Sequence, residues 1–64
     1  MDNRLAELRA TQHLSQAALA EALGVSRQTV ISIERGRFDP SLPLAFRIAG
    51  YFDSTIEDVF RPDD

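Results

Sequence analysis

Residues 16–35 read QAALAEALGVSRQTVISIER, and this stretch decides the fold. Apolar residues recur there at helical spacing, which predicts one short helix at about 16–23 and a second at about 27–35. Gly24 lies where the chain must turn, because glycine adopts a positive φ without a steric penalty. Ser26 lies where the second helix must begin, because its hydroxyl can accept a hydrogen bond from an unpaired backbone N–H. The stretch therefore predicts two helices folded about a tight turn, with one face of the second helix left free. The buried stripes are expected to be Leu19, Ala20 and Leu23 in the first helix and Val30 and Ile33 in the second.

The free face of the second helix carries side chains suited to base edges in a DNA groove. On a helical wheel Gln28 and Ser32 point away from the buried stripe, and Ile31 lies beside them. Arginine can donate twice to guanine, glutamine can pair with adenine, and an isoleucine can meet a thymine methyl group. The alternative is an ordinary solvated face, but such faces usually carry Glu and Lys, and this one has neither before Glu34. We therefore predict contacts with bases in the major groove for Arg27, Gln28, Ile31 and Ser32.

A second set of polar residues lies where phosphates could be met. Gln16 opens the first helix of the pair, where unpaired N–H groups and the helix dipole favour an anion. Arg35 and Arg37 flank Gly36 at the end of the second helix, and both can reach the DNA backbone across the groove. For the two arginines, simple surface solubility is the alternative. The residues predicted to contact phosphate are Gln16, Ser26, Thr29, Arg35 and Arg37.

Length and composition limit the other possibilities. The chain has 64 residues, which suits one domain over 1–64 with a small core. It has no cysteine, one histidine and no apolar run of membrane-spanning length, so neither a metal site nor membrane association is expected. We find no nucleophile–base pair and no glycine-rich phosphate loop, so no enzyme activity, cofactor or small-molecule effector is expected. The N-terminus lacks a signal-peptide pattern, which predicts a cytoplasmic protein associated with the nucleoid.

The charge is distributed unevenly along the chain. The net charge is −3, which taken alone argues against a nucleic-acid partner. Residues 26–37 nevertheless carry a net charge of +2, because three arginines oppose one glutamate, whereas residues 38–64 carry −4. The positive charge therefore coincides with the free helix face, and the acid lies at the far end of the chain.

Three further helices complete the all-α, compact five-helix expectation. They are predicted at about 4–11, 42–52 and 56–60, and no strand is expected. Asp2 or Asn3 would cap the first of them, and Thr55 would cap the last. Gly50 is unexpected inside a helix, where it costs roughly 1 kcal/mol relative to alanine. A close helix contact or an early fraying of the helix would explain it.

The helix at about 42–52 is apolar on more than one side and carries Arg47 as its only charge. Such a helix must be buried on more than one side, and a chain of this length has few elements to cover it. We therefore predict a homodimer, which would place two recognition helices about 34 Å apart and require an inverted repeat in the DNA. The alternative is a monomer in which the first and fifth helices cover every apolar side. The predicted interface residues are Leu42, Phe46, Ile56, Val59 and Phe60.

These motifs resemble the lambda-repressor-like (Cro/Xre-type) helix-turn-helix family of transcriptional regulators. The resemblance covers nearly the whole chain, and its most specific stretches are LSQ at 14–16, GVSRQTV at 24–30, IERG at 33–36 and DPSLPL at 39–44. It is closest to the short stand-alone regulators of the cytolysin-repressor type, which work as homodimers. The resemblance implies that Gln16 contacts phosphate and braces Gln28. It also implies a partly buried ion pair between Arg9 and Glu34.

Two functions from different classes follow from the sequence. The favoured hypothesis is a sequence-specific regulator of transcription, a repressor that binds an inverted-repeat operator in double-stranded DNA as a homodimer. The alternative is a protein-interaction module such as an antitoxin-like or adaptor protein, which the acidic net charge and the apolar fourth helix motivate. The alternative would make Phe46 or Phe60 essential and the face at 27–35 dispensable.

Overall fold

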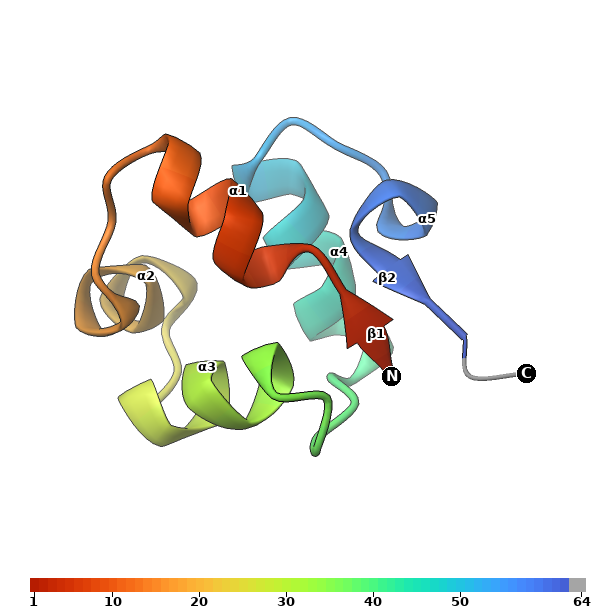
Figure 1. The fold of residues 1–64 in the computed structure, drawn as a ribbon, viewed down its shortest axis with the longest axis horizontal. Coiled ribbons are helices and arrows are strands. Elements are labelled where there is room, and N and C mark those ends of the chain that lie inside the picture. The colour runs from red at the N-terminus through yellow and green to blue at the C-terminus, as the bar shows by residue number, and fades with distance from the viewer. Residues whose placement is uncertain (63–64) are drawn as a thin grey trace.

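The computed structural model describes residues 1–62, which form five helices and one short ribbon (Figure 1). This arrangement confirms the predicted five-helix fold. None of the helices in the described range is long and apolar enough to span a lipid bilayer. Residues 63 and 64, the last two acids of the negatively charged C-terminal half, lie outside the described residues. In chain order the elements are β1 (Asp2–Asn3), α1 (Leu5–Thr11), α2 (Gln16–Leu23), α3 (Arg27–Glu34), α4 (Leu42–Tyr51), α5 (Ile56–Val59) and β2 (Phe60–Arg61).

Hydroxyl side chains set the first residue of four helices. Ser15, Ser26, Ser41 and Thr55 each accept a hydrogen bond from the backbone N–H three residues later, at 3.0, 3.2, 3.3 and 3.2 Å. Each bond satisfies one of the N–H groups that a helix start leaves unpaired. At the other end of α2, Gly24 adopts the left-handed conformation with φ 74°, as predicted for the turn.

A two-stranded antiparallel ribbon joins the two ends of the described chain, so the expectation of no strand is wrong. Asp2 pairs with Arg61 and Asn3 pairs with Phe60. Asn3 also differs from the predicted cap, because the N-cap of α1 is Arg4, while the Asn3 Oδ1 accepts from the Leu5 N–H at 3.0 Å. Strands of two residues are too short to show an alternating pattern in the sequence. Their pairing depends on how the helices between them fold.

One hydrophobic core lies among the five helices, and it includes two residues that we had placed in a dimer interface. Val59 and Phe60 are exposed to only 0% and 5%, respectively. Their side chains therefore pack inside their own chain and are not available to a second copy, which corrects the predicted interface. A short terminal helix that is apolar on several sides does not reveal from its sequence which partner buries it. The largest fully buried side chains are Leu5, Leu19, Val30, Ile33, Ile48 and Val59.

The outer side of α4 remains uncovered in the described chain. Leu42 and Phe46 are exposed to 64% and 61%, and Gly50 continues the same stripe four residues later. A Cβ atom at Gly50 would meet nothing within 4 Å, and α4 continues through this residue to Tyr51. Within the described chain, therefore, neither a close contact nor early fraying explains the glycine.

Candidate nucleic-acid interface

The helix pair α2 and α3 positions the candidate interface. Leu19 of α2 and both Val30 and Ile33 of α3 are buried in the common core. The turn between the helices is closed by the Val25 N–H, which donates to the Ala20 carbonyl at 3.0 Å. Because the inner side of α3 is fixed in the core, its opposite side faces outward.

We call this outward side the α3 face and define it as Arg27, Gln28, Ile31, Ser32 and Arg35. Arg27, Gln28 and Arg35 are exposed, while Ile31 and Ser32 are half-buried. Gln28 Nε2 donates to Ser32 Oγ at 3.4 Å, along the helix. All four residues predicted to contact bases therefore share one surface, and Gln28 points away from the core.

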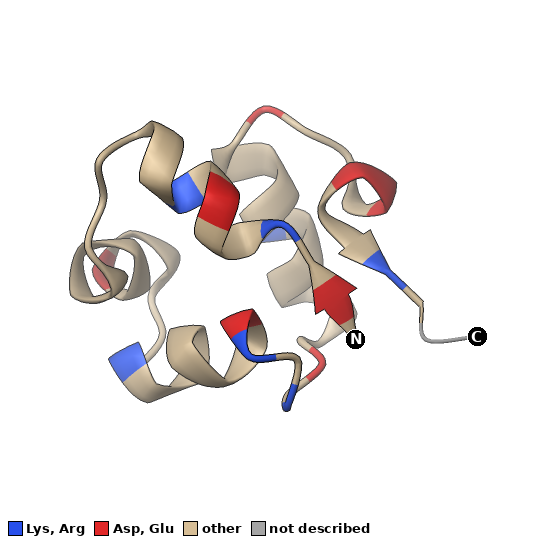
Figure 2. Cartoon of the chain, in the orientation of Figure 1, with Lys and Arg blue, Asp and Glu red and all other residues tan. Residues whose placement is uncertain are grey.

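The residues predicted to contact phosphate fall at both ends of α3. Arg35 and Arg37 are exposed at its C-terminal end. Ser26 and Thr29 lie at its N-terminal end, where their hydroxyl oxygens are 2.9 Å apart and share one hydrogen bond. Figure 2 shows basic positions at both ends of α3 and acidic positions on α5 and in the loop before it. The charge separation predicted from the sequence is thus present in space.

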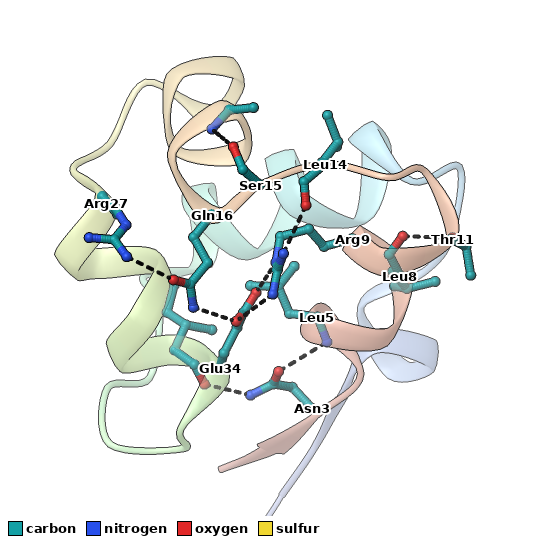
Figure 3. A network of polar contacts seen from close by, with 12 residues as sticks. Asn3, Leu5, Leu8, Arg9, Thr11, Leu14, Ser15, Gln16, Arg27 and Glu34 are labelled. Carbon is teal, nitrogen blue, oxygen red and sulfur yellow. Dashed lines mark hydrogen bonds and ion pairs between the residues drawn. The ribbon is translucent and has the colours of Figure 1, made fainter.

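A chain of polar side chains supports this face from inside the protein (Figure 3). Arg9 donates to Glu34 through Nε at 2.7 Å and through Nη2 at 3.3 Å, and its Nη1 donates to the Leu14 carbonyl at 2.8 Å. The Glu34 side chain is only 7% exposed. Gln16 Nε2 donates to Glu34 Oε1 at 3.1 Å, and Arg27 Nη2 donates to Gln16 Oε1 at 3.4 Å. The hydrogen bonds therefore run from α1 through α3 and α2 to the first residue of α3.

The outcome for the residues implied by family resemblance is mixed. Arg9 and Glu34 form the expected ion pair. Gln16, however, is hydrogen-bonded to Arg27, whereas the resemblance implies Gln28 as its partner. The register of α3 places Arg27 at its first position, directly opposite the start of α2, while Gln28 is turned toward Ser32.

Two further residues stabilise the position of α3 and were not found from the sequence. Arg47 of α4 donates to the Leu23 carbonyl at the end of α2 at 2.8 Å. Asn3 donates to the Ile33 carbonyl near the end of α3 at 2.7 Å. The members of these pairs lie 24 and 30 residues apart along the chain, so no spacing rule could reveal them. Within residues 1–62, no group of His, Asp or Glu side chains is arranged to hold a metal ion.

Comparison with known proteins agrees with this geometry. The model of the helix-turn-helix family matches residues 5–59. The chain belongs to the Cro/Xre-type helix-turn-helix family. Over all of its length it is 55% identical to an uncharacterised HTH-type transcriptional regulator from Methanocaldococcus jannaschii, of which it covers 97%. Family membership makes the chain a DNA-binding regulator of transcription at this general level.

Two solved structures share the fold of this family member. The restriction-modification controller protein C.AhdI from Aeromonas hydrophila matches with a TM-score of 0.78 and 37% identity, over 89% of this chain and 86% of that one. The hydroxypropylphosphonic acid epoxidase from S. wedmorenis matches with a TM-score of 0.79 and 30% identity, over 94% of this chain. This chain spans only 32% of that epoxidase, so the similarity concerns one part of a larger protein.

Proposed function

We propose that the chain represses transcription by binding an inverted-repeat operator in double-stranded DNA as a homodimer, with α3 in the major groove. The observation that carries this proposal is the α3 face. Its guanidinium, amide and hydroxyl groups are presented outward from a helix whose other side is fixed in the core. Such groups hydrogen-bond to base edges in the major groove. Bound there, the protein would occlude a promoter that overlaps the operator.

The proposed contacts divide into base recognition and phosphate binding. One hydrogen of the Gln16 amide bonds to Glu34, which leaves the second for a phosphate oxygen. Ser26 and Thr29 use one hydroxyl hydrogen between them, which leaves the other for phosphate. Arg35 and Arg37 would hold the backbone at the far end of α3. Base contacts are proposed for Arg27, Gln28, Ile31 and Ser32.

The second copy is proposed to pack against the α4 face, which we define as Leu42, Phe46, Gly50 and Ile56. A shallow hollow next to the exposed Phe46 ring is lined by Gly50 and Ile56, among other residues. In a two-fold dimer each copy presents both the ring and the hollow, so the ring of one copy can enter the hollow of the other. The missing side chain at Gly50 then has a function that the isolated chain does not give it. Val59 and Phe60 support this face from the core beneath.

The DNA proposal is tested by selecting bound sequences from random duplexes and measuring affinity for the selected sequence over a range of salt concentrations. We expect an inverted repeat and a steep fall in affinity with salt, with a log–log slope near −0.9 per phosphate contact. Arg27→Ala and Gln28→Ala should each cost about 1 to 3 kcal/mol per half-site and relax the base preference. Gln12→Ala, an exposed glutamine beyond the end of α1, is the matched control and should change neither. Absence of any binding at low salt would refute the proposal.

The dimer is tested by sedimentation equilibrium of the wild type and of Phe46→Ala. We expect a wild-type dimer and a large shift of the variant toward monomer, because the ring would lose its apolar partner. Tyr51→Ala removes another exposed aromatic from a different side of α4 and should leave the dimer intact. If Phe46→Ala remains dimeric, the α4 face is not the interface. If the wild type is monomeric while Phe46 is needed to retain a different protein, the adaptor alternative is favoured.

A further inference from the structure

We infer that Gln16 is a positioning residue that orients Arg27 and thereby sets a preference for guanine at one position of each half-site. This inference rests on the proposed function, because it requires α3 to lie in the major groove. It goes beyond a phosphate contact for Gln16, since it makes a residue of α2 responsible for a choice between bases.

The orientation of the Gln16 amide is imposed by the protein interior. An ionised carboxylate accepts hydrogen bonds but donates none, so the Gln16 group that faces Glu34 must be the NH₂ group. Glu34 cannot turn to change this, because Arg9 holds both of its oxygens and its side chain is almost fully buried. The carbonyl oxygen of Gln16 is therefore directed away from Glu34 and toward solvent, where Arg27 meets it.

This carbonyl oxygen fixes the Arg27 guanidinium at the start of α3. In Figure 3 the guanidinium is directed at Gln16, whose amide lies between it and Glu34. The bond uses one of the five N–H donors of the guanidinium, and a bidentate contact with guanine needs only two. A free arginine side chain loses much rotamer entropy when it binds, whereas a side chain already held in place loses less. Gln16 therefore favours the one arrangement of Arg27 that can accept a guanine.

Gln28 offers an internal comparison. Its amide is hydrogen-bonded to Ser32 of the same helix, and α2 does not contribute to its orientation. A change at Gln16 should therefore alter the base chosen at the Arg27 position and leave the base chosen at the Gln28 position unaffected. A residue that only stabilised the fold or only contacted phosphate would change both positions equally.

The experiment selects bound sequences from random duplexes with the full chain and with five variants. For Gln16→Met we expect the preference for guanine at the Arg27 position to fall by about tenfold, while the preference at the Gln28 position is kept. Arg27→Ala should remove the guanine preference, and Gln16→Met added to Arg27→Ala should change it no further. Gln28→Ala is the control that alters the other position only.

Gln16→Lys separates positioning from folding and from phosphate binding. A lysine can still pair with Glu34 and with phosphate, but it offers no acceptor to Arg27. We therefore expect a folded protein that keeps most of its affinity for DNA and loses guanine preference. The inference is overturned if both Gln16 variants keep the guanine preference, or if the wild type selects no guanine that depends on Arg27. Selection of no sequence at all by the wild type would instead refute the proposed function.

Discussion

The α3 face and the α4 face are both exposed, yet the protein supports them by opposite means. Behind the α3 face lies an almost buried carboxylate, which Arg9 and Gln16 bind through directional hydrogen bonds. Behind the α4 face lie only apolar side chains, with Ile48 and Val59 fully buried. A surface that recognises base edges needs donors fixed in direction, whereas apolar burial is non-directional and needs only a rigid helix of the right shape. The support beneath each face therefore matches the kind of partner proposed for it.

The largest effect is expected from removing the polar support. Glu34→Ala leaves the partly buried Arg9 guanidinium without its carboxylate, and breaking a buried ion pair in this way typically costs 3 to 5 kcal/mol. Since Arg9 is 21% exposed, we expect a loss of about 3 kcal/mol in the free energy of unfolding, measured by urea denaturation. Glu21→Ala removes an exposed glutamate of α2 and should have little effect. Equal losses in the two variants would show that the network contributes nothing to stability.

A smaller effect is expected from weakening the apolar support. Val59→Ala deletes two buried methyl groups and should lower the free energy of unfolding by about 2 kcal/mol. Phe46→Ala removes a larger side chain from the exposed surface, so unfolding of the monomer should change by less than about 0.5 kcal/mol. Denaturation at concentrations low enough to dissociate a dimer separates the two variants. A large loss for Phe46→Ala under those conditions would mean that its ring packs within its own chain.

Arg47 links the two halves of the molecule, and its removal should have a moderate effect. Its hydrogen bond to the Leu23 carbonyl closes the end of α2 from α4. Arg47→Met keeps most of the aliphatic stem and loses this bond, at a cost of about 1 kcal/mol. Hydrogen exchange should show faster opening at the end of α2 than in the wild type. Arg61→Met, at an exposed position in β2, is the control and should leave α2 unchanged.

The local elements were predictable, and the contacts between them were not. Ser15, Ser26 and Gly24 set helix ends through groups a few residues away, so their roles can be inferred from spacing. The ribbon and the bond from Arg47 to Leu23 join residues far apart in the chain, and they exist only once the helices have packed.

Family resemblance reached further than spacing, but it did not reach the details. It identified Arg9 and Glu34 as a pair, which the structure contains. It assigned Gln16 to the wrong member of α3, because adjacent residues of one helix point about 100° apart. A substitution at either position can therefore move such a contact without changing the motif.

The smallest effect is expected at Arg4 and Glu7, an ion pair of the same chemical kind as Arg9 and Glu34 but fully exposed on α1. The Arg4 guanidinium donates to both Glu7 oxygens at 3.3 Å. This hydrogen bond, together with the attraction between the charges, lowers the pKa of Glu7 and raises the pKa of Arg4. A carboxyl with a lowered pKa in the folded state stabilises the fold above its unfolded-state pKa and loses that contribution as the pH falls through the folded-state pKa. Glu7→Gln should therefore lower the melting temperature slightly at neutral pH and not at all in strong acid, and added salt should reduce the difference because water and ions screen both groups. If Glu7→Gln cost as much stability as Glu34→Ala, burial would not be what distinguishes the two pairs, and the contrast between a supported α3 face and an ordinary surface would be lost.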